Sequence, residues 1–165
     1  MKILPQLSLV GILLFAGCVT QPPRITNTPS GKPEVAIATN DVARIKSMII
    51  GDLVNHGYTV EQDTEYSLTL SRRLSGGEDM VAALAVGNSY SSNTRLATYT
   101  FVRDGNSVRV ILAAQIRAQM PGGQVKSQPL DGNNSIFNTF QQQLLEFKKK
   151  IEAPAPNDAK KPENA

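Results

Sequence analysis

The sequence predicts an α+β fold, a two-layer sandwich in which an antiparallel meander sheet is covered on one face by two helices. Several segments alternate between apolar and polar residues with a period of two, which is typical of half-buried strands. Two other segments repeat apolar residues at spacings of three and four, which is typical of amphipathic helices. Because every element has a single apolar face, one helical layer on one sheet face buries them all.

The first strand and the first helix are predicted within residues 34–57. Residues 34–39 alternate weakly, as a strand does. Asn40 is expected to cap the helix that follows, with Asp41 in its first turn. Gly57 suits the left-handed position after a helix, and we expect His56 to meet the free carbonyl groups there. The apolar stripe of this helix comprises Val42, Ile45, Ile49 and Leu53.

Three alternating segments follow and predict the main strands of the sheet. An extended segment that begins at residues 58–60 precedes them, and a hairpin turn at residues 104–106 joins the second to the third. A turn at residues 121–123 then leads to a short edge strand around Val125. Their apolar faces comprise Tyr66, Leu68 and Leu70; Ala97, Tyr99 and Phe101; and Val108, Val110, Leu112, Ala114, Ile116 and Ala118.

The last helix is predicted to begin at residues 131–134. Residues 141–143, three glutamines, are expected on or near its solvent side. Three lysines at residues 148–150 complement the helix dipole, and Pro154 ends the helix. Its buried stripe comprises Ile136, Phe137, Phe140, Leu144, Phe147 and Ile151.

The N-terminus has the composition of an export signal. Lys2 precedes an apolar run over residues 3–15, which is shorter than the roughly 20 residues of a membrane-spanning helix. Small residues then precede Cys18, the one cysteine. Residues 14–18, Leu-Phe-Ala-Gly-Cys, resemble the lipobox of bacterial lipoproteins, although Phe15 stands where that motif usually has leucine. The resemblance implies a signal peptide over residues 1–17 and acylation of Cys18 with palmitate or a similar chain. An uncleaved anchor and an ordinary secretory signal are the alternatives.

The same resemblance also implies where in the cell the protein is located. Val19 stands where an aspartate tends to retain such lipoproteins in the inner membrane, so we expect an outer-membrane, periplasm-facing protein in a Gram-negative host. Residues 18–33 are rich in proline and polar residues, which predicts a flexible tether after the lipidated cysteine. Residues 34–152 form the expected α+β domain, and residues 153–165 are expected to be a disordered tail.

Composition argues against several classes of function. The formal net charge is +3, which is too nearly balanced to favour nucleic acid as a partner. With one histidine and no cysteine besides Cys18, we expect no metal site and no cofactor. No serine has a credible base or elbow motif, and no glycine pair carries the phosphate-loop signature, so we expect no enzyme.

Two features are candidate partner contacts. The first is the apolar run at residues 80–87, which reads either as a short buried element or as a mobile flap that touches a partner, a lipid or a binding groove. Its candidate contact residues are Met80, Val81, Leu84 and Val86. The second is a group of arginines, Arg72 and Arg73 with Arg109 and Arg117, expected on the open face of the sheet. These arginines form either an ordinary solvated surface or a basic surface for anionic headgroups or an acidic partner.

The order of elements resembles the helix-grip domains of some outer-membrane assembly lipoproteins. The predicted function is therefore a non-enzymatic envelope lipoprotein, an accessory or assembly subunit held by acylated Cys18 next to an envelope protein complex. The alternative is a periplasm-facing binding module for a lipid or another amphipathic ligand. A cavity lined by Leu84, Tyr99 and Phe140 would favour the binding module, whereas a filled core with an exposed apolar patch would favour the subunit.

Overall fold

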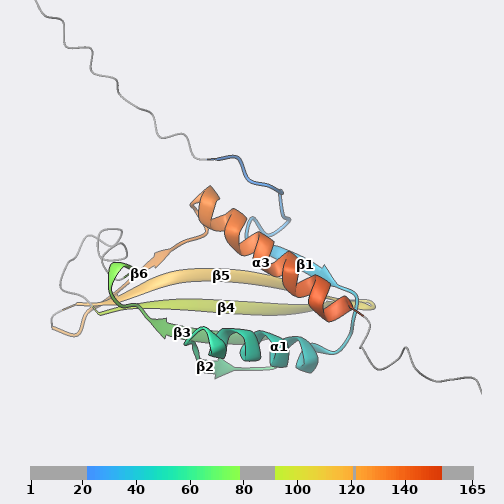
Figure 1. Ribbon diagram of the computed structural model, residues 1–165, viewed down its shortest axis with the longest axis horizontal. Coiled ribbons are helices and arrows are strands. Elements are labelled where there is room, and N and C mark those ends of the chain that lie inside the picture. Colours follow the sequence, from blue (N-terminus) through green and yellow to red (C-terminus); the bar gives the residue numbers. More distant parts are fainter. Residues whose placement is uncertain (1–21, 79–91, 121, 154–165) are drawn as a thin grey trace, which may run out of the picture.

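The computed structural model describes residues 22–78, 92–120 and 122–153, and these residues form an antiparallel sheet of six strands with two helices (Figure 1). The two-layer α+β arrangement predicted from the sequence is confirmed. The strands are β1 (Glu34–Ile37), β2 (Thr59–Asp63), β3 (Ser67–Arg73), β4 (Ser92–Asp104), β5 (Ser107–Gln119) and β6 (Val125–Pro129). The helices are α1 (Val42–Asn55) and α3 (Asn134–Glu152).

Strands β2 to β6 form a meander in which each strand pairs antiparallel with the next. Strand β1 instead pairs with β5, so the sheet order runs β1, β5, β4, β3, β2. The 13-residue strand β5 is long enough to hold two partners along one edge. Strand β1 pairs with Val108–Ile111, and β6 pairs with Gln115–Gln119.

The ends of α1 follow the expected chemistry with one correction. The capping residue is Asp41 rather than Asn40, because the Asp41 carboxylate accepts a hydrogen bond from the backbone N–H of Arg44 at 2.8 Å, three residues on. Gly57 has a φ of 79°, which confirms its left-handed position after the helix. The imidazole Nδ1 of His56 lies 2.7 Å from the carbonyl oxygen of Asp52, as expected of a residue at a helix end.

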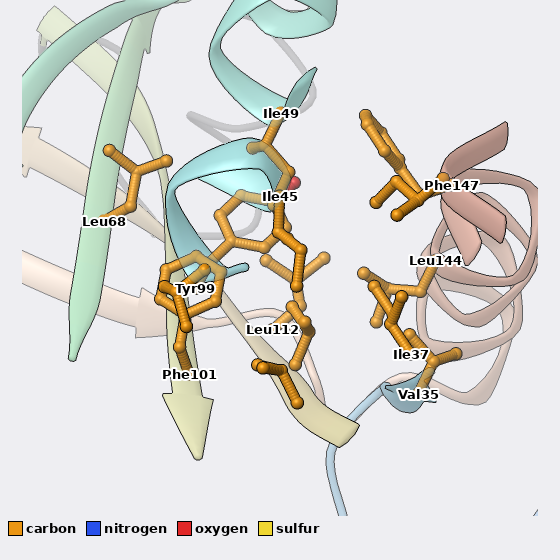
Figure 2. Close-up of a cluster of buried hydrophobic side chains, with 14 of the residues drawn as sticks. Val35, Ile37, Ile45, Ile49, Leu68, Tyr99, Phe101, Leu112, Leu144 and Phe147 are labelled. Atoms are coloured by element: carbon orange, nitrogen blue, oxygen red, sulfur yellow. The ribbon is translucent and has the colours of Figure 1, made fainter. Parts of the chain in front are cut away.

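The core lies between the two helices and one face of the sheet (Figure 2). Ile45 and Ile49 enter it from α1, and Leu144 and Phe147 enter it from α3. Because these side chains meet the same strand residues, both helices cover the same face. The strand residues at the centre of the core are Leu68, Leu70, Tyr99, Phe101, Val108, Val110 and Leu112.

Gln141 is buried, with only 3% of its surface exposed. This finding corrects the prediction that residues 141–143 all lie on or near the solvent side of the helix. Gln141 lies four residues after Phe137 and three before Leu144, and this spacing places it on the buried stripe. Its amide accepts a hydrogen bond from the backbone N–H of Glu34 and donates one to the carbonyl oxygen of Glu34, both at 2.9 Å. A single side chain therefore binds α3 to the outer edge of β1.

We expect Gln141→Leu to lower the free energy of unfolding by about 2–4 kcal/mol, because the change leaves two buried backbone groups of Glu34 without partners. The neighbouring change Gln142→Leu is the control, since Gln142 is exposed and should shift stability by less than about 0.5 kcal/mol. Urea unfolding followed by circular dichroism measures both. Equal midpoints for the two variants would contradict the role assigned to Gln141.

Residues 23–25 pack against the first turns of α3. The Arg24 guanidinium lies over the ring of Phe137, 4.4 Å from its centroid. The Asn138 side chain forms 2.9 Å hydrogen bonds with the backbone of the two residues that flank Arg24, Pro23 and Ile25. Asn134 and Asn138 therefore hold this part of the chain against the start of α3 through side-chain hydrogen bonds. The flexible tether expected over residues 18–33 stays a prediction, since residues 18–21 lie outside the described residues.

Cys18 and the apolar candidates Met80, Val81, Leu84 and Val86 lie outside the described residues. Within the described ranges, no helix is both long enough and apolar enough to cross a membrane.

Candidate functional site

A pocket of about 400 Å³ lies between the two helices on the covered face of the sheet. In Figure 1 the helices are closest where α1 begins and α3 ends, and they spread apart towards the end of α1 and the start of α3. The C-terminal residues of α1, the middle turns of α3 and the strands beneath them line the pocket. Figure 2 shows part of the same region, with Tyr99 and Leu112 on the strand side and Leu144 and Phe147 on the helix side.

The floor of the pocket is apolar and is made by neighbouring strands. Ala97 and Tyr99 share one face of β4 because side chains alternate along a strand. Ala97 pairs directly with Ala114 of β5, and two small side chains at this point leave space above the sheet. Phe140 and Leu144 of α3 face the floor from the opposite wall. The pocket therefore has an apolar interior between two helices that do not close over it.

The rim of the pocket carries charged and polar groups. The ammonium group of Lys150 on α3 lies 3.7 Å from the carboxylate of Asp52 on α1, so one ion pair joins the two walls. His56, Gln143 and Glu146 also line the opening, and all three are exposed to solvent.

Two arginines lie side by side at one end of the floor. Arg72 of β3 and Arg95 of β4 are direct cross-strand partners, and both line the pocket. The Nη2 atom of Arg72 donates to both carboxylate oxygens of Glu78, at 2.7 and 2.9 Å, and the guanidinium lies 5.4 Å from the centroid of the Tyr58 ring. Arg95 forms no ion pair with any residue that the structure describes. The buried Nε atoms of both arginines have no hydrogen-bond acceptor in the same described part of the chain.

Tyr99 is the most buried titratable group of the pocket. Burial raises the pKa of its phenol far above the ordinary value, and the nearby Tyr58 and Asp52 add to the shift. The hydroxyl therefore stays neutral throughout the physiological range. The pocket thus combines a neutral apolar floor with a positively charged end, an arrangement suited to binding a molecule that is apolar along most of its length and anionic at one end.

The structure separates the four arginines that were expected on the open face of the sheet. Arg72 instead lies on the helix-covered face, because it continues the register of Leu68 and Leu70 along β3. Arg73, Arg109 and Arg117 have the opposite parity and lie on the open face. Two of these three are near acidic partners, since Arg117 pairs with Glu61 at 2.8 Å and Arg109 lies 4.0 Å from Glu34.

Arg95 is the pocket residue that sequence reasoning missed. The signal was present, since Arg95 is two residues before Ala97 and four before Tyr99 and so continues the apolar face of its strand. A charged residue in register with a buried face is costly unless something compensates it. A search of β3 and β4 for charged residues in register with the buried face identifies both Arg72 and Arg95.

A second, more open groove lies beside α1 and differs in its charges. The acidic and basic residues there neutralise one another, with ion pairs between Lys46 and Asp63 and between Arg103 and Glu65. No group of three or more His, Cys, Asp or Glu side chains suited to a metal ion occurs within residues 22–78, 92–120 and 122–153. Comparison of the chain with known protein families finds no match, and comparison with characterised proteins finds none either.

Proposed function

We propose that this protein is a non-enzymatic envelope lipoprotein, anchored in the outer membrane through acylated Cys18, whose domain binds an amphipathic ligand in the pocket between α1 and α3. The observation that carries the proposal is the pocket itself, which is lined by Tyr99 and Phe140 and has a charged end. A volume of about 400 Å³ lies within the range of small-molecule sites, roughly 300–1,000 Å³. A filled space between the helices would have favoured the subunit reading instead.

The packing of residues 23–25 against α3 supports a site close to the membrane. Pro23 is held against Asn138 of α3 and follows Cys18 by five residues. Five fully extended residues span at most about 18 Å. If Cys18 carries the anchor, the first turns of α3 therefore stay within a short distance of the lipid surface, where amphipathic molecules are concentrated.

The accessory-subunit reading has weaker support. The large exposed apolar side chains within the described residues are spread over separate segments, at Ile25, Val54, Val60, Tyr66 and Val125. The outer strand β2 is exposed along its whole length, but it carries a bulge between Val60 and Gln62 and the charged residues Glu61 and Asp63. Bulges and charges are devices that prevent an edge strand from pairing with another chain.

The proposal is tested by purifying the lipidated protein from membranes in mild detergent and measuring its mass under native conditions. We expect a bound small molecule at one per chain, and we expect Gln143→Trp to remove it, because residue 143 lines the pocket. Gln142→Trp is the matched control, since Gln142 is equally exposed on the same helix and does not line the pocket.

The expected result is at least a tenfold lower occupancy for Gln143→Trp than for Gln142→Trp. Two results contradict the proposal: a wild-type protein that carries no small molecule, and a small molecule that both variants retain equally. A protein partner that co-purifies in place of a small molecule would support the accessory-subunit reading.

A further inference from the structure

We propose that the ligand of this pocket is an amphiphile with one anionic group, a carboxylate or a phosphate, held at Arg95 and Arg72, and that its acyl chain lies along the apolar floor. The inference rests on the proposed function, because it names the chemical class of the ligand for the same pocket. The observation that supports it is the pair Arg72 and Arg95, because acidic groups within the described residues neutralise only one of the two charges.

The pairing of Arg72 with Arg95 places two positive charges opposite each other, and the described residues neutralise only one of them. Like charges placed directly opposite each other on neighbouring strands destabilise a sheet. Glu78 neutralises Arg72 through an ion pair, which leaves the charge of Arg95 without an ion-pair partner among the residues described. An anionic group bound beside Arg95 would balance this charge and remove the repulsion across the strand pair.

The hydrogen-bond donors lead to the same class of ligand. The Nε–H groups of both arginines, like that of Arg109 on the open face, are buried and lack acceptors within the described residues. A buried donor without a partner costs stability, so a sheet that keeps two of them at one place gains when an acceptor arrives. The guanidinium fork matches the geometry of carboxylate and phosphate oxygens, which makes these anions the best acceptors for this site.

The apolar floor fits a single short acyl chain. Strand β4 carries Arg95, Ala97 and Tyr99 on one face, and an extended strand rises about 3.4 Å per residue, so the floor reaches roughly 14 Å from Arg95 to Tyr99. Leu112 and Phe140 border this path. The pocket volume is near the lower end of small-molecule sites, which favours one chain over two. The neutral phenol of Tyr99 adds no charge that would repel the anion.

The inference is tested on the mature chain, residues 18–165, with Cys18→Ser so that no attached lipid competes. Isothermal titration calorimetry at pH 7.5 compares dodecanoate with glycerol monododecanoate, which has the same chain and no charge. We expect dodecanoate to bind at least tenfold more tightly, because hydrogen bonds to a charged group are the stronger class. Lysophosphatidylglycerol with a dodecanoyl chain distinguishes a lipid headgroup from a free fatty acid as the source of the anion.

The key variant is Arg95→Gln, and its matched control is Arg103→Gln. Both arginines belong to β4, but Arg103 is exposed and is paired with Glu65 outside the pocket. We expect Arg95→Gln to weaken dodecanoate binding about tenfold or more and to leave glycerol monododecanoate unchanged, whereas Arg103→Gln changes neither by more than about twofold. Arg95→Lys keeps the positive charge but lacks the planar guanidinium, so its affinity for dodecanoate should lie between those of the wild type and Arg95→Gln.

Stability provides a second readout. We expect the ligand-free Arg95→Gln protein to melt at or above the wild-type temperature, because the change removes an unbalanced charge and a buried donor without an acceptor. A purely structural arginine would give the opposite result. Marked destabilisation by Arg95→Gln would therefore count against a ligand-binding role.

The outcomes separate this inference from the proposed function. Equal affinity for the charged and neutral amphiphiles, with no effect of Arg95→Gln, would overturn the anionic ligand while leaving the pocket as a binding site. Failure of all three amphiphiles to bind, together with a membrane-purified protein that carries no small molecule, would overturn both.

Discussion

Cys18→Ala is expected to abolish acylation and to remove the protein almost completely from the outer membrane. The expected loss is large because the acyl chains supply the membrane-binding energy: one chain gives only marginal binding, while two or more hold a protein on the bilayer. Under the proposed lipoprotein assignment, all of that energy is attached to Cys18, the only cysteine of the chain. Growth with radiolabelled palmitate, followed by separation of inner and outer membranes, measures both effects.

Val19→Asp is the matched variant that tests the predicted location in the outer membrane. The resemblance to lipoproteins implies that this variant remains labelled with palmitate but is retained in the inner membrane. An unlabelled Cys18→Ala protein at its full level in the outer membrane would contradict the lipoprotein assignment. A wild-type chain without label would favour an uncleaved anchor or an ordinary secretory signal.

Ile45→Ala is expected to cause the largest loss of stability among single changes in α1. Ile45 has no exposed surface and packs between the helices and the sheet at the centre of the core (Figure 2). Truncating a buried isoleucine to alanine costs about 2–5 kcal/mol, because transfer energy is lost and a cavity remains. For a domain of this size we expect the melting temperature to fall by about 10–20 °C.

Val54→Ala is the control for this prediction. Val54 lies on the same helix and is 49% exposed, so its truncation should change the free energy of unfolding by less than about 0.5 kcal/mol. Thermal unfolding followed by circular dichroism compares the two variants. Similar melting temperatures for Ile45→Ala and Val54→Ala would contradict the orientation of α1 on the sheet.

The two-layer fold follows from patterns that are local in the sequence. The alternation of β5 is uninterrupted from Val108 to Ala118, and every second residue of that run is buried in the structure. The stripes of α1 and α3 likewise become the buried faces of the helices. Patterns of this kind report directly which face of an element is apolar, so they predict the layers well.

The partners of individual elements could not be predicted in the same way. The pairing of β1 with β5 joins segments that are more than 70 residues apart, and nothing in either segment specifies the other. Gln141 was expected on or near the solvent side because glutamine is usually exposed, but the backbone of β1 offers it two hydrogen bonds. The packing of residues 23–25 also depends on side chains of α3 that only the folded chain brings near.

The pocket was partly predictable. Tyr99 and Phe140 were expected to line any cavity between the layers, and both line the pocket. Arg72 was singled out for its charge but expected on the wrong face, and Arg95 was missed. The error had a physical source: a charged residue was assumed to face solvent, although the registers of β3 and β4 place both arginines on the covered face.

The most direct test of the central claim is a crystal structure of the protein purified from its own membranes without exchange of the bound material. We expect elongated electron density over Ala97 and Tyr99 that ends in a polar group within hydrogen-bond distance of the Arg95 guanidinium. A pocket filled only by water, with the two helices in the same positions, would contradict the claim that this space is the binding site of the protein.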